Sequence, residues 1–251
     1  MQLDAARLRD FYRTPLGQVV RRQLAAQIRQ RWPSVAGLTV MGAGFATPYL
    51  GSYRTEAVRT GCLMPARQGA LVWPPGGKCH SLLVEEHHWP LPDNSVDRLL
   101  AVHMIDAAER AGPVLREIWR VLAPDGRVML IVPNRSGVWS RIDTTPFGQG
   151  LPFSHSQLAQ YLSDALLTPV GWGGALFFPP VSNRFALRMA PALERTGTKL
   201  SRGLGGVMIV EARKDLMAPI SGGVRAQTVP VFKPAGSFGR AAADQDAGAE
   251  A

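Results

Sequence analysis

A glycine-rich turn between an apolar run and a helical stretch is the first part of this sequence that could do chemistry. It reads VMGAGFATPYL and covers residues 40–50. Glycine lets the backbone approach a ligand closely, and the N-terminus of a following helix presents free N–H groups and a positive dipole end. Gly42 and Gly44 would supply that approach, while Thr47 and Pro48 would cap and begin the helix. The turn predicts a site for a nucleotide-type ligand.

His103 is a candidate for proton transfer because it ends another apolar run, residues 98–103. Histidine exchanges protons near neutral pH and can serve as a general base. A hydrogen-bonded structural histidine is the alternative. The residues that raise the question of a metal are Cys79, His80, His87 and His88. They lack the C-x-x-C and i, i+4 histidine spacings of zinc sites, so the sequence predicts no metal.

Short apolar runs alternate with helical stretches through the middle of the chain. The runs that read as strands are 38–43, 81–85, 98–103 and 127–132. The clearest helix covers 113–122 and has proline in its first turn. A further helix over 157–165 would start from a Ser154 or Ser156 cap, and 203–214 reads as a late strand. The alternation predicts βαβ units and a mostly parallel sheet.

The two ends of the chain differ from its middle. Residues 3–31 carry apolar positions near a helical period, interrupted at Thr14-Pro15, which predicts two amphipathic helices packed on the main domain. The last 35 residues hold 17 Gly, Pro or Ala, and VPVFKP (229–234) is the one segment among them with apolar side chains that could bind a partner. We therefore predict N-terminal helices over 1–33, an α/β domain over 34–216 and a disordered tail over 217–251.

Length and composition indicate one main domain without a membrane span. The chain has 251 residues, 46% of them hydrophobic, enough for one sizeable core. Its longest aliphatic run, 128–132, is far shorter than the roughly 20 apolar residues that cross a bilayer. Residues 1–10 contain no secretory h-region. We expect a soluble, cytoplasmic protein whose two cysteines are reduced thiols.

The positive charge is concentrated at the N-terminus. The net charge is +9, and residues 1–33 hold seven Arg against two Asp, a net +5. Such a field can attract nucleic acid, anionic lipid or an acidic protein. The alternative is a solvated, arginine-biased surface, because the basic residues are spread along helices without a Lys/Arg block.

Three longer stretches carry a resemblance to one family, and the last two together are specific. They are VMGAGFATPYL, LVEEHHWPLPDNSVDRLLAVHMID (83–106) and REIWRVLAPDGRVMLIVPN (116–134). The first stands where the family has V-L-D-x-G-x-G-x-G, the second is similar to its acid followed by L-P-F-p-D-x-S-F-D, and the third to its E-x-x-R-V-L-k-P-G-G. On these motifs the chain resembles the class I S-adenosylmethionine-dependent methyltransferases, in particular those with a type 11 methyltransferase domain, over roughly residues 34–135.

The resemblance implies an α/β fold with a Rossmann-like, doubly wound, seven-stranded sheet and S-adenosyl-L-methionine over the carboxyl ends of its strands. The methionine part of the cofactor would lie at the glycine turn. Glu85, or its neighbour Glu86, would bond the adenine amino group, and His103 would face the reacting methyl. Tyr12 would cover the cofactor or belong to the core. The implied cofactor-binding residues are Tyr12, Gly42, Gly44, Phe45, Ala46, Thr47, Met64, Pro65, Glu85, Glu86 and His103.

Two acidic groups of the family pattern are missing. If Gly42-Ala-Gly44-Phe-Ala46 matches G-x-G-x-G, the acidic position holds Val40. If Gly44 is instead the first glycine of the pattern, the acidic position holds Gly42. The family also has an acid after its second strand for the ribose hydroxyls, and here Met64 and Pro65 stand in that region. These two residues could pack on a cofactor but could not bond a diol.

The region after the last quoted motif would recognise the acceptor in this family. Residues 135–155 form a loop whose large or polar side chains could form a lid, a partner surface or ordinary packing: Trp139, Arg141, Phe147, Phe153 and His155.

The most favoured hypothesis is a methyltransferase acting on an unidentified small-molecule or protein acceptor. The alternative is a catalytically inactive relative that binds a protein partner through this loop, the basic N-terminus or the tail. Nucleic acid is a less favoured acceptor because no recognition module is present. A nicotinamide dehydrogenase ranks last, since the turn reads G-x-G-x-x-T and no ribose acid follows.

Overall fold

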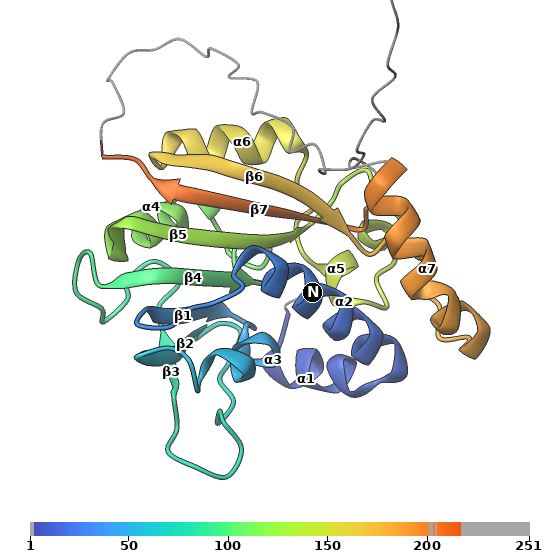
Figure 1. Cartoon of the computed structure of the whole chain (residues 1–251), viewed down its shortest axis with the longest axis horizontal. Coiled ribbons are helices and arrows are strands. Elements are labelled where there is room, and N and C mark those ends of the chain that lie inside the picture. Colours follow the sequence, from blue (N-terminus) through green and yellow to red (C-terminus); the bar gives the residue numbers. More distant parts are fainter. Residues whose placement is uncertain (1–2, 201–202, 204, 217–251) are drawn as a thin grey trace, which may run out of the picture. The chain divides into compact units, whose positions relative to one another are not determined.

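Seven strands form one mixed sheet in the order β3-β2-β1-β4-β5-β7-β6 (Figure 1). The computed structural model describes residues 3–200, 203 and 205–216. The strands are β1 (Thr39–Gly44), β2 (Arg59–Pro65), β3 (Ser81–Val84), β4 (Val96–Val102), β5 (Leu122–Pro133), β6 (Leu167–Ala175) and β7 (Val207–Lys214). Strands β1 to β5 are parallel, whereas β7 is antiparallel to both β5 and β6. The predicted Rossmann-like, seven-stranded sheet is confirmed.

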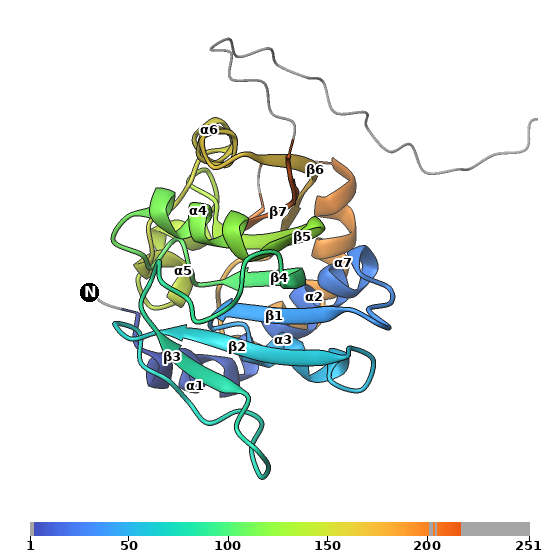
Figure 2. The same cartoon turned by 90° about the vertical axis from the view of Figure 1, so that its left-hand side faces the viewer.

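Helices pack on both faces of this sheet (Figure 2). One face carries α1 (Ala5–Arg13), α2 (Pro15–Arg31), α3 (Thr47–Leu50) and α7 (Arg184–Leu200), and the other carries α4 (Ala111–Val121) and α6 (His155–Asp164). The short segments η1 (Gly51–Tyr53), η2 (Trp139–Arg141) and α5 (Pro146–Gln149) lie in connections. Alternate residues of β4 enter different cores: Leu99 joins the α4 side and Leu100 the α1 side. The parallel strands are therefore apolar on both faces, as their near-continuous hydrophobic runs require.

Side-chain caps explain where several helices begin. Thr14 separates α1 from α2, because its Oγ1 accepts a hydrogen bond from Gly17 N at 3.0 Å and donates one to Phe11 O at 2.7 Å. Of the two serines proposed to cap α6, Ser154 does so, with Gln157 N donating to its Oγ at 3.2 Å. The prediction that Thr47 caps α3 is wrong, since α3 begins at Thr47 and its N-cap is Ala46, which makes no side-chain bond.

The segment predicted as a tail, 217–251, and VPVFKP within it lie outside the described residues. Among the described helices, none combines the length and the apolarity that a membrane crossing needs.

A buried ion pair joins α4 to the loop before β4. Glu117 Oε1 accepts hydrogen bonds from Trp89 N at 2.8 Å and from Arg120 Nη2 at 2.6 Å, while Arg120 also donates to Leu91 O at 2.9 Å. Burial alone would raise the pKa of Glu117, but Arg120 and the Trp89 amide hold it below its ordinary value. The two motifs that carry the resemblance, P-L-P-D-N-S-V-D and E-x-x-R, are thus held together by one clamp.

Two of the strand connections contain no helix. Residues 66–80 join β2 to β3, and residues 85–95 join β3 to β4, both without a helical turn. The β3 edge of the sheet is therefore thinly covered, and Leu82 and Leu83 are 47% and 54% exposed.

Replacing Glu117 by glutamine should destabilise the fold by about 1–3 kcal/mol, because Arg120 and the Trp89 amide lose an ionised partner. The folded-state pKa lies below the unfolded value, so this contribution is complete above the ordinary glutamate pKa of about 4.3 and is lost as the pH falls through the lowered folded-state pKa. Urea unfolding of Glu117→Gln between acid and neutral pH measures it. Glu109→Gln is the control, since Glu109 pairs with Arg67 on the surface and its side chain is 73% exposed. Equal effects of the two changes would contradict the clamp.

Candidate functional site

The glycine turn is pressed against the carboxyl end of β4. Gly44 has a φ of +72°, and a Cβ built on it would lie 2.4 Å from Val102 O. Phe45 N donates to the same carbonyl at 2.7 Å. A Cβ on Gly42 would lie 2.7 Å from both Ala46 Cβ and Leu50 Cδ1, so α3 packs directly back on β1. Both glycines are required by close approach, and the approach at Gly44 joins the ends of β1 and β4.

His103 directly follows β4 and holds a left-handed conformation, with a φ of +49°. This conformation is uncommon for a residue with a Cβ and is sustained where surrounding contacts fix it. Gln68 Nε2 donates to His103 O at 2.8 Å, which holds the peptide. The side chain is 1% exposed. His103 is therefore a fixed, buried imidazole at the carboxyl edge.

A hydrogen-bonded chain runs through the two ring nitrogens of His103. Its Nε2 lies 3.0 Å from Tyr12 Oη, and its Nδ1 lies 3.4 Å from Asp106 Oδ2. Tyr49 Oη donates to Tyr12 Oη at 3.1 Å, which leaves the Tyr12 proton for His103. Burial raises the pKa of Tyr12 well above its usual range, so this phenol stays protonated. His103 thus accepts at Nε2, and its proton sits on Nδ1, facing Asp106.

Aromatic rings enclose this chain on several sides. Tyr12 stacks on Phe45, with ring centroids 5.6 Å apart, and Phe147 lies 4.7 Å from the imidazole. Trp139 contacts Phe147 edge-on at 5.7 Å, and its Nε1 donates to Phe178 O at 2.7 Å. The imidazole is therefore shielded from water by side chains from α1, the glycine turn and the loop after β5.

Two buried acceptors near His103 have no hydrogen-bond partner among the described residues. They are Gln68 Oε1 and Asp106 Oδ1. Unpaired buried polar atoms are uncommon and costly, so each indicates a ligand, a water or a function. Beside Gln68 is a small cavity of about 10 Å³, lined by Leu3, Pro65, Arg67, Gln68, Glu86, Met104, Ala107 and Ala108. The carboxyl edge thus offers polar acceptors but little free space.

The residues expected to bind a cofactor gather at this edge, with one difference between the two glutamates. The buried members are Tyr12, Gly42, Gly44, Phe45, Ala46, Thr47, Met64, Pro65 and His103. Glu86 lines the small cavity, and its Oε2 accepts from Glu109 N at 3.1 Å. Glu85 is exposed and forms a backbone bridge with His88.

The five loop residues divide between the two faces of the sheet. Trp139 and Phe147 belong to the core that contains His103's neighbours. Phe153 is buried on the opposite face, where it contacts Tyr161. Arg141 is exposed, and His155 is exposed with its ring 3.9 Å from that of Trp172 on β6. Of these five, Phe147 therefore contacts the imidazole, and Trp139 contacts Phe147.

Sequence reasoning missed Gln68, Tyr49 and the role of Asp106. Asp106 follows His103 by three residues, and that spacing was a usable signal once β4 was placed. Gln68 lies just beyond β2, in the region where the family pattern has its acid for the ribose hydroxyls. Tyr49 carried no signal, because its partner Tyr12 is 37 residues away.

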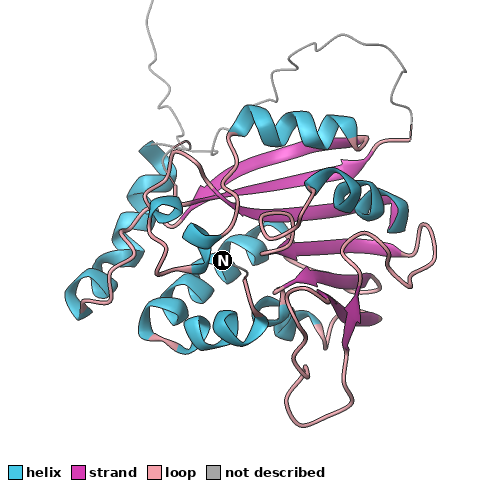
Figure 3. Ribbon diagram, turned by 180° about the vertical axis from the view of Figure 1, so that it is seen from behind, coloured by secondary structure: helices cyan, strands magenta, loops and turns pink. Residues whose placement is uncertain are grey.

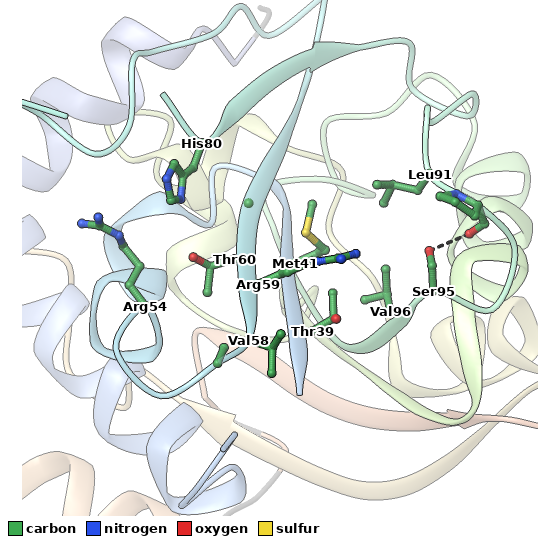
Figure 4. A pocket seen from close by; sticks show the side chains of 13 residues that line it. Thr39, Met41, Arg54, Val58, Arg59, Thr60, His80, Leu91, Ser95 and Val96 are labelled. Carbon is green, nitrogen blue, oxygen red and sulfur yellow. Dashed lines mark hydrogen bonds between the residues drawn. The ribbon is translucent and has the colours of Figure 1, made fainter. Parts of the chain in front are cut away.

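A groove of about 530 Å³ lies at the opposite, amino ends of the strands (Figure 4). Figure 4 shows Arg54 and His80 on one side of the strands and Leu91 and Ser95 on the other. It is lined by the first residues of β1, β2 and β4, not by those near His103. Groups of three or more histidine, cysteine or acidic residues that could hold a metal do not occur among the described residues.

Comparison with known proteins identifies a domain match and similar folds. Residues 41–130 match a methyltransferase domain. The fold is similar to a SAM-dependent methyltransferase of Thermotoga maritima, a possible histamine N-methyltransferase (14% identity, 82% of this chain, 94% of that chain, TM-score 0.55). It is also similar to a SAM-dependent methyltransferase of Aquifex aeolicus (17%, 84%, 98%, 0.55). A third similar structure is the geranyl diphosphate C-methyltransferase of Streptomyces coelicolor A3(2) with Mg²⁺, geranyl diphosphate and S-adenosyl-L-homocysteine (14%, 76%, 76%, 0.52). The sequence matches no curated protein significantly.

Changing Gly44 to alanine should destabilise the fold by about 2–4 kcal/mol, because a Cβ meets the Val102 carbonyl and the left-handed φ is strained. Gly51→Ala is the matched control. Gly51 has a helical φ of −55°, and a Cβ there meets nothing within 4 Å, so the change should be neutral or slightly stabilising. Thermal unfolding of both variants tests the contact. Similar melting temperatures for the two would show that the turn is not pressed against β4.

Proposed function

We propose that this chain is an S-adenosylmethionine-dependent methyltransferase, because it carries a methyltransferase domain and the class I methyltransferase fold. In this proposal, His103 receives the proton of the methyl acceptor at the carboxyl edge of the sheet. The observation that supports this proposal is the pairing of a buried imidazole with a buried carboxylate where β4 ends. Asp106 orients the ring and would stabilise the imidazolium that forms when Nε2 takes a proton. The acceptor is a small molecule or a protein side chain with an O–H or N–H group.

The buried acceptors fit the cofactor of this family. S-adenosyl-L-methionine has hydroxyl, amino and ammonium groups that donate hydrogen bonds, and it supplies an electrophilic methyl group when bound. Gln68 Oε1 has no partner among the described residues, and Glu86 lines the adjoining cavity. Gln68 and Glu86 would therefore replace the two acids missing from the family pattern. Met64 and Pro65 would pack on the cofactor, and the backbone at Gly44 would lie against its methionine part.

Binding requires α1 to move. The cavity beside Gln68 has a volume of about 10 Å³, room for one water at most. Tyr12, Phe45, Met64 and His103 are each less than 10% exposed. The segment over them is held by Ala5 N donating to Gln68 O at 2.7 Å and by the contact of Tyr12 with His103. Displacing α1 would expose Gln68 and release His103 Nε2 together.

Positioning would then do most of the catalytic work. Aligning an acceptor atom with an activated methyl removes much of the entropic barrier, so the transfer needs only a modest base. Tyr12 Oη lies at the distance from His103 Nε2 that an acceptor hydroxyl would take. The rings of Phe45 and Phe147 flank this position and would exclude water from it. This lining suits an acceptor whose reacting group is attached to an apolar or aromatic body.

The two adjacent glutamates provide a matched pair for testing the cofactor site. Glu86→Gln should weaken S-adenosylhomocysteine binding by about 5- to 20-fold, since a partly buried charged acceptor is lost, whereas Glu85→Gln should leave it unchanged. Isothermal titration calorimetry measures both constants. The reverse order would place the adenine end at Glu85, as the sequence motif implies. If the wild-type chain takes up no cofactor at millimolar concentration, the methyltransferase proposal fails and the protein-binding alternative remains.

Asp106→Asn tests the positioning of His103 without needing a known acceptor. In the wild-type chain, ¹⁵N chemical shifts of the imidazole should show the proton on Nδ1 and a bare Nε2. Asparagine can present its amide N–H to Nδ1, so the variant should populate the other tautomer. The exposed ring of His87 serves as an internal control in the same spectrum. An unchanged His103 tautomer in Asp106→Asn would refute the orienting role.

A further inference from the structure

Helix α7 is firmly attached to the fold along one side. Ala190 is buried, and Leu187 packs against the same core. The Glu194 carboxylate accepts hydrogen bonds from Leu176 N at 3.0 Å and Phe177 N at 2.9 Å. Farther along, a Cβ on Gly197 would lie 2.2 Å from Phe177 Cγ, so the helix is close to its support there. The orientation of α7 about its own axis is therefore fixed.

The opposite side of α7 exposes large apolar side chains. Phe185, Met189 and Leu193 are 73%, 43% and 39% exposed. They are spaced by four residues, and at about 100° per residue they form one continuous stripe beside the buried side. The apolar arc of the helix is thus roughly twice as wide as the part that the fold covers. Val181, 41% exposed just before the helix, adds to the same kind of surface.

Arginines flank this stripe on its outer border. Arg184 and Arg188 are exposed, and neither forms an ion pair with a described residue. At about 100° per residue they lie about 40° apart, on the side of Phe185 away from Leu193, with Arg188 about 60° and Arg184 about 100° from Phe185. Glu194 is the sole acidic residue between 184 and 197, and it faces the core. The outward side of α7 therefore combines an apolar stripe with positive charge and no negative charge.

We propose that α7 binds an anionic membrane surface, with Phe185, Met189 and Leu193 inserted among the acyl chains and Arg184 and Arg188 at the lipid phosphates. Helices with a wide apolar arc bordered by arginine lie in the membrane interface in this way. Guanidinium groups pair well with phosphate oxygens, which matches the charge of an anionic headgroup layer. Figures 1 and 3 show α7 at the border of the fold beside α2, where a flat surface can reach it.

Other occupants match this face less well. A second copy of the chain would meet it by two-fold symmetry and bring two sets of unpaired arginines together. A nucleic acid would pair with the arginines but leave the apolar stripe in water. An anionic lipid layer satisfies both the stripe and the arginines.

Vesicle sedimentation of the full chain tests the proposal. The protein should sediment with phosphatidylcholine vesicles that contain about 30% phosphatidylglycerol, stay in solution with pure phosphatidylcholine, and be released as salt screens the charges. The double changes Phe185→Ser with Met189→Ser and Arg184→Gln with Arg188→Gln should each weaken binding at least about tenfold, since each arginine contributes about 1 kcal/mol near the surface.

Matched controls separate α7 from the rest of the surface. Val58→Ser removes an apolar side chain that is 67% exposed elsewhere, and Arg116→Gln removes an exposed arginine on α4. Both should bind vesicles as the wild-type chain does, and all variants should melt at similar temperatures. No sedimentation of the wild-type chain, equal binding to neutral vesicles, or equal effects of the control and α7 changes would overturn the proposal. A wild-type dimer that Phe185→Ser with Met189→Ser makes monomeric would show that the occupant is a second copy.

Discussion

The approach of Gly44 to the carbonyl end of β4 is the contact on which the carboxyl edge depends. It leaves no room for a Cβ, so the turn after β1 and the residues after β4 occupy one small volume. Phe45 stacks on the Tyr12 ring, while His103 meets the Tyr12 hydroxyl. The left-handed backbone of His103 lies beside this contact, with Gln68 holding its carbonyl. One backbone contact thus determines how three distant parts of the chain surround an imidazole.

The carboxyl edge is buried and yet contains unpaired polar atoms, a combination that does not favour the stability of the fold. A core that needed only stability would be apolar there, because unpaired acceptors such as Gln68 Oε1 cost free energy when they are buried. Their presence under a single helix, α1, is consistent with a site that closes when it is empty and opens to take a ligand. Stability and ligand binding would then share one element.

Much of the fold was predictable because it follows from local patterns. The strand runs and the Thr14-Pro15 break each have a short-range physical cause, that of the break being the Thr14 cap. The site was less predictable where a single residue of register matters. The third strand was expected to end at Glu85 and ends at Val84, and a shift of one residue exchanges which of two neighbouring side chains faces the pocket. The pairing of Tyr12 with His103 spans 91 residues and has no signature in sequence.

The chain leaves apolar surface uncovered in two places, and their chemistry differs. At β3 it results from two connections without helices, and Leu82 and Leu83 project from a short edge strand. On α7 the exposed apolar surface exists because the apolar arc of the helix is wider than the part of the helix that packs on the core. Here arginines lie on the same helix. An edge strand offers backbone hydrogen bonds as well as side chains, which suits a protein segment. A helix pairs most of its backbone groups internally, so whatever binds the outward side of α7 is attracted mainly by its apolar and cationic side chains. A lipid layer needs nothing more.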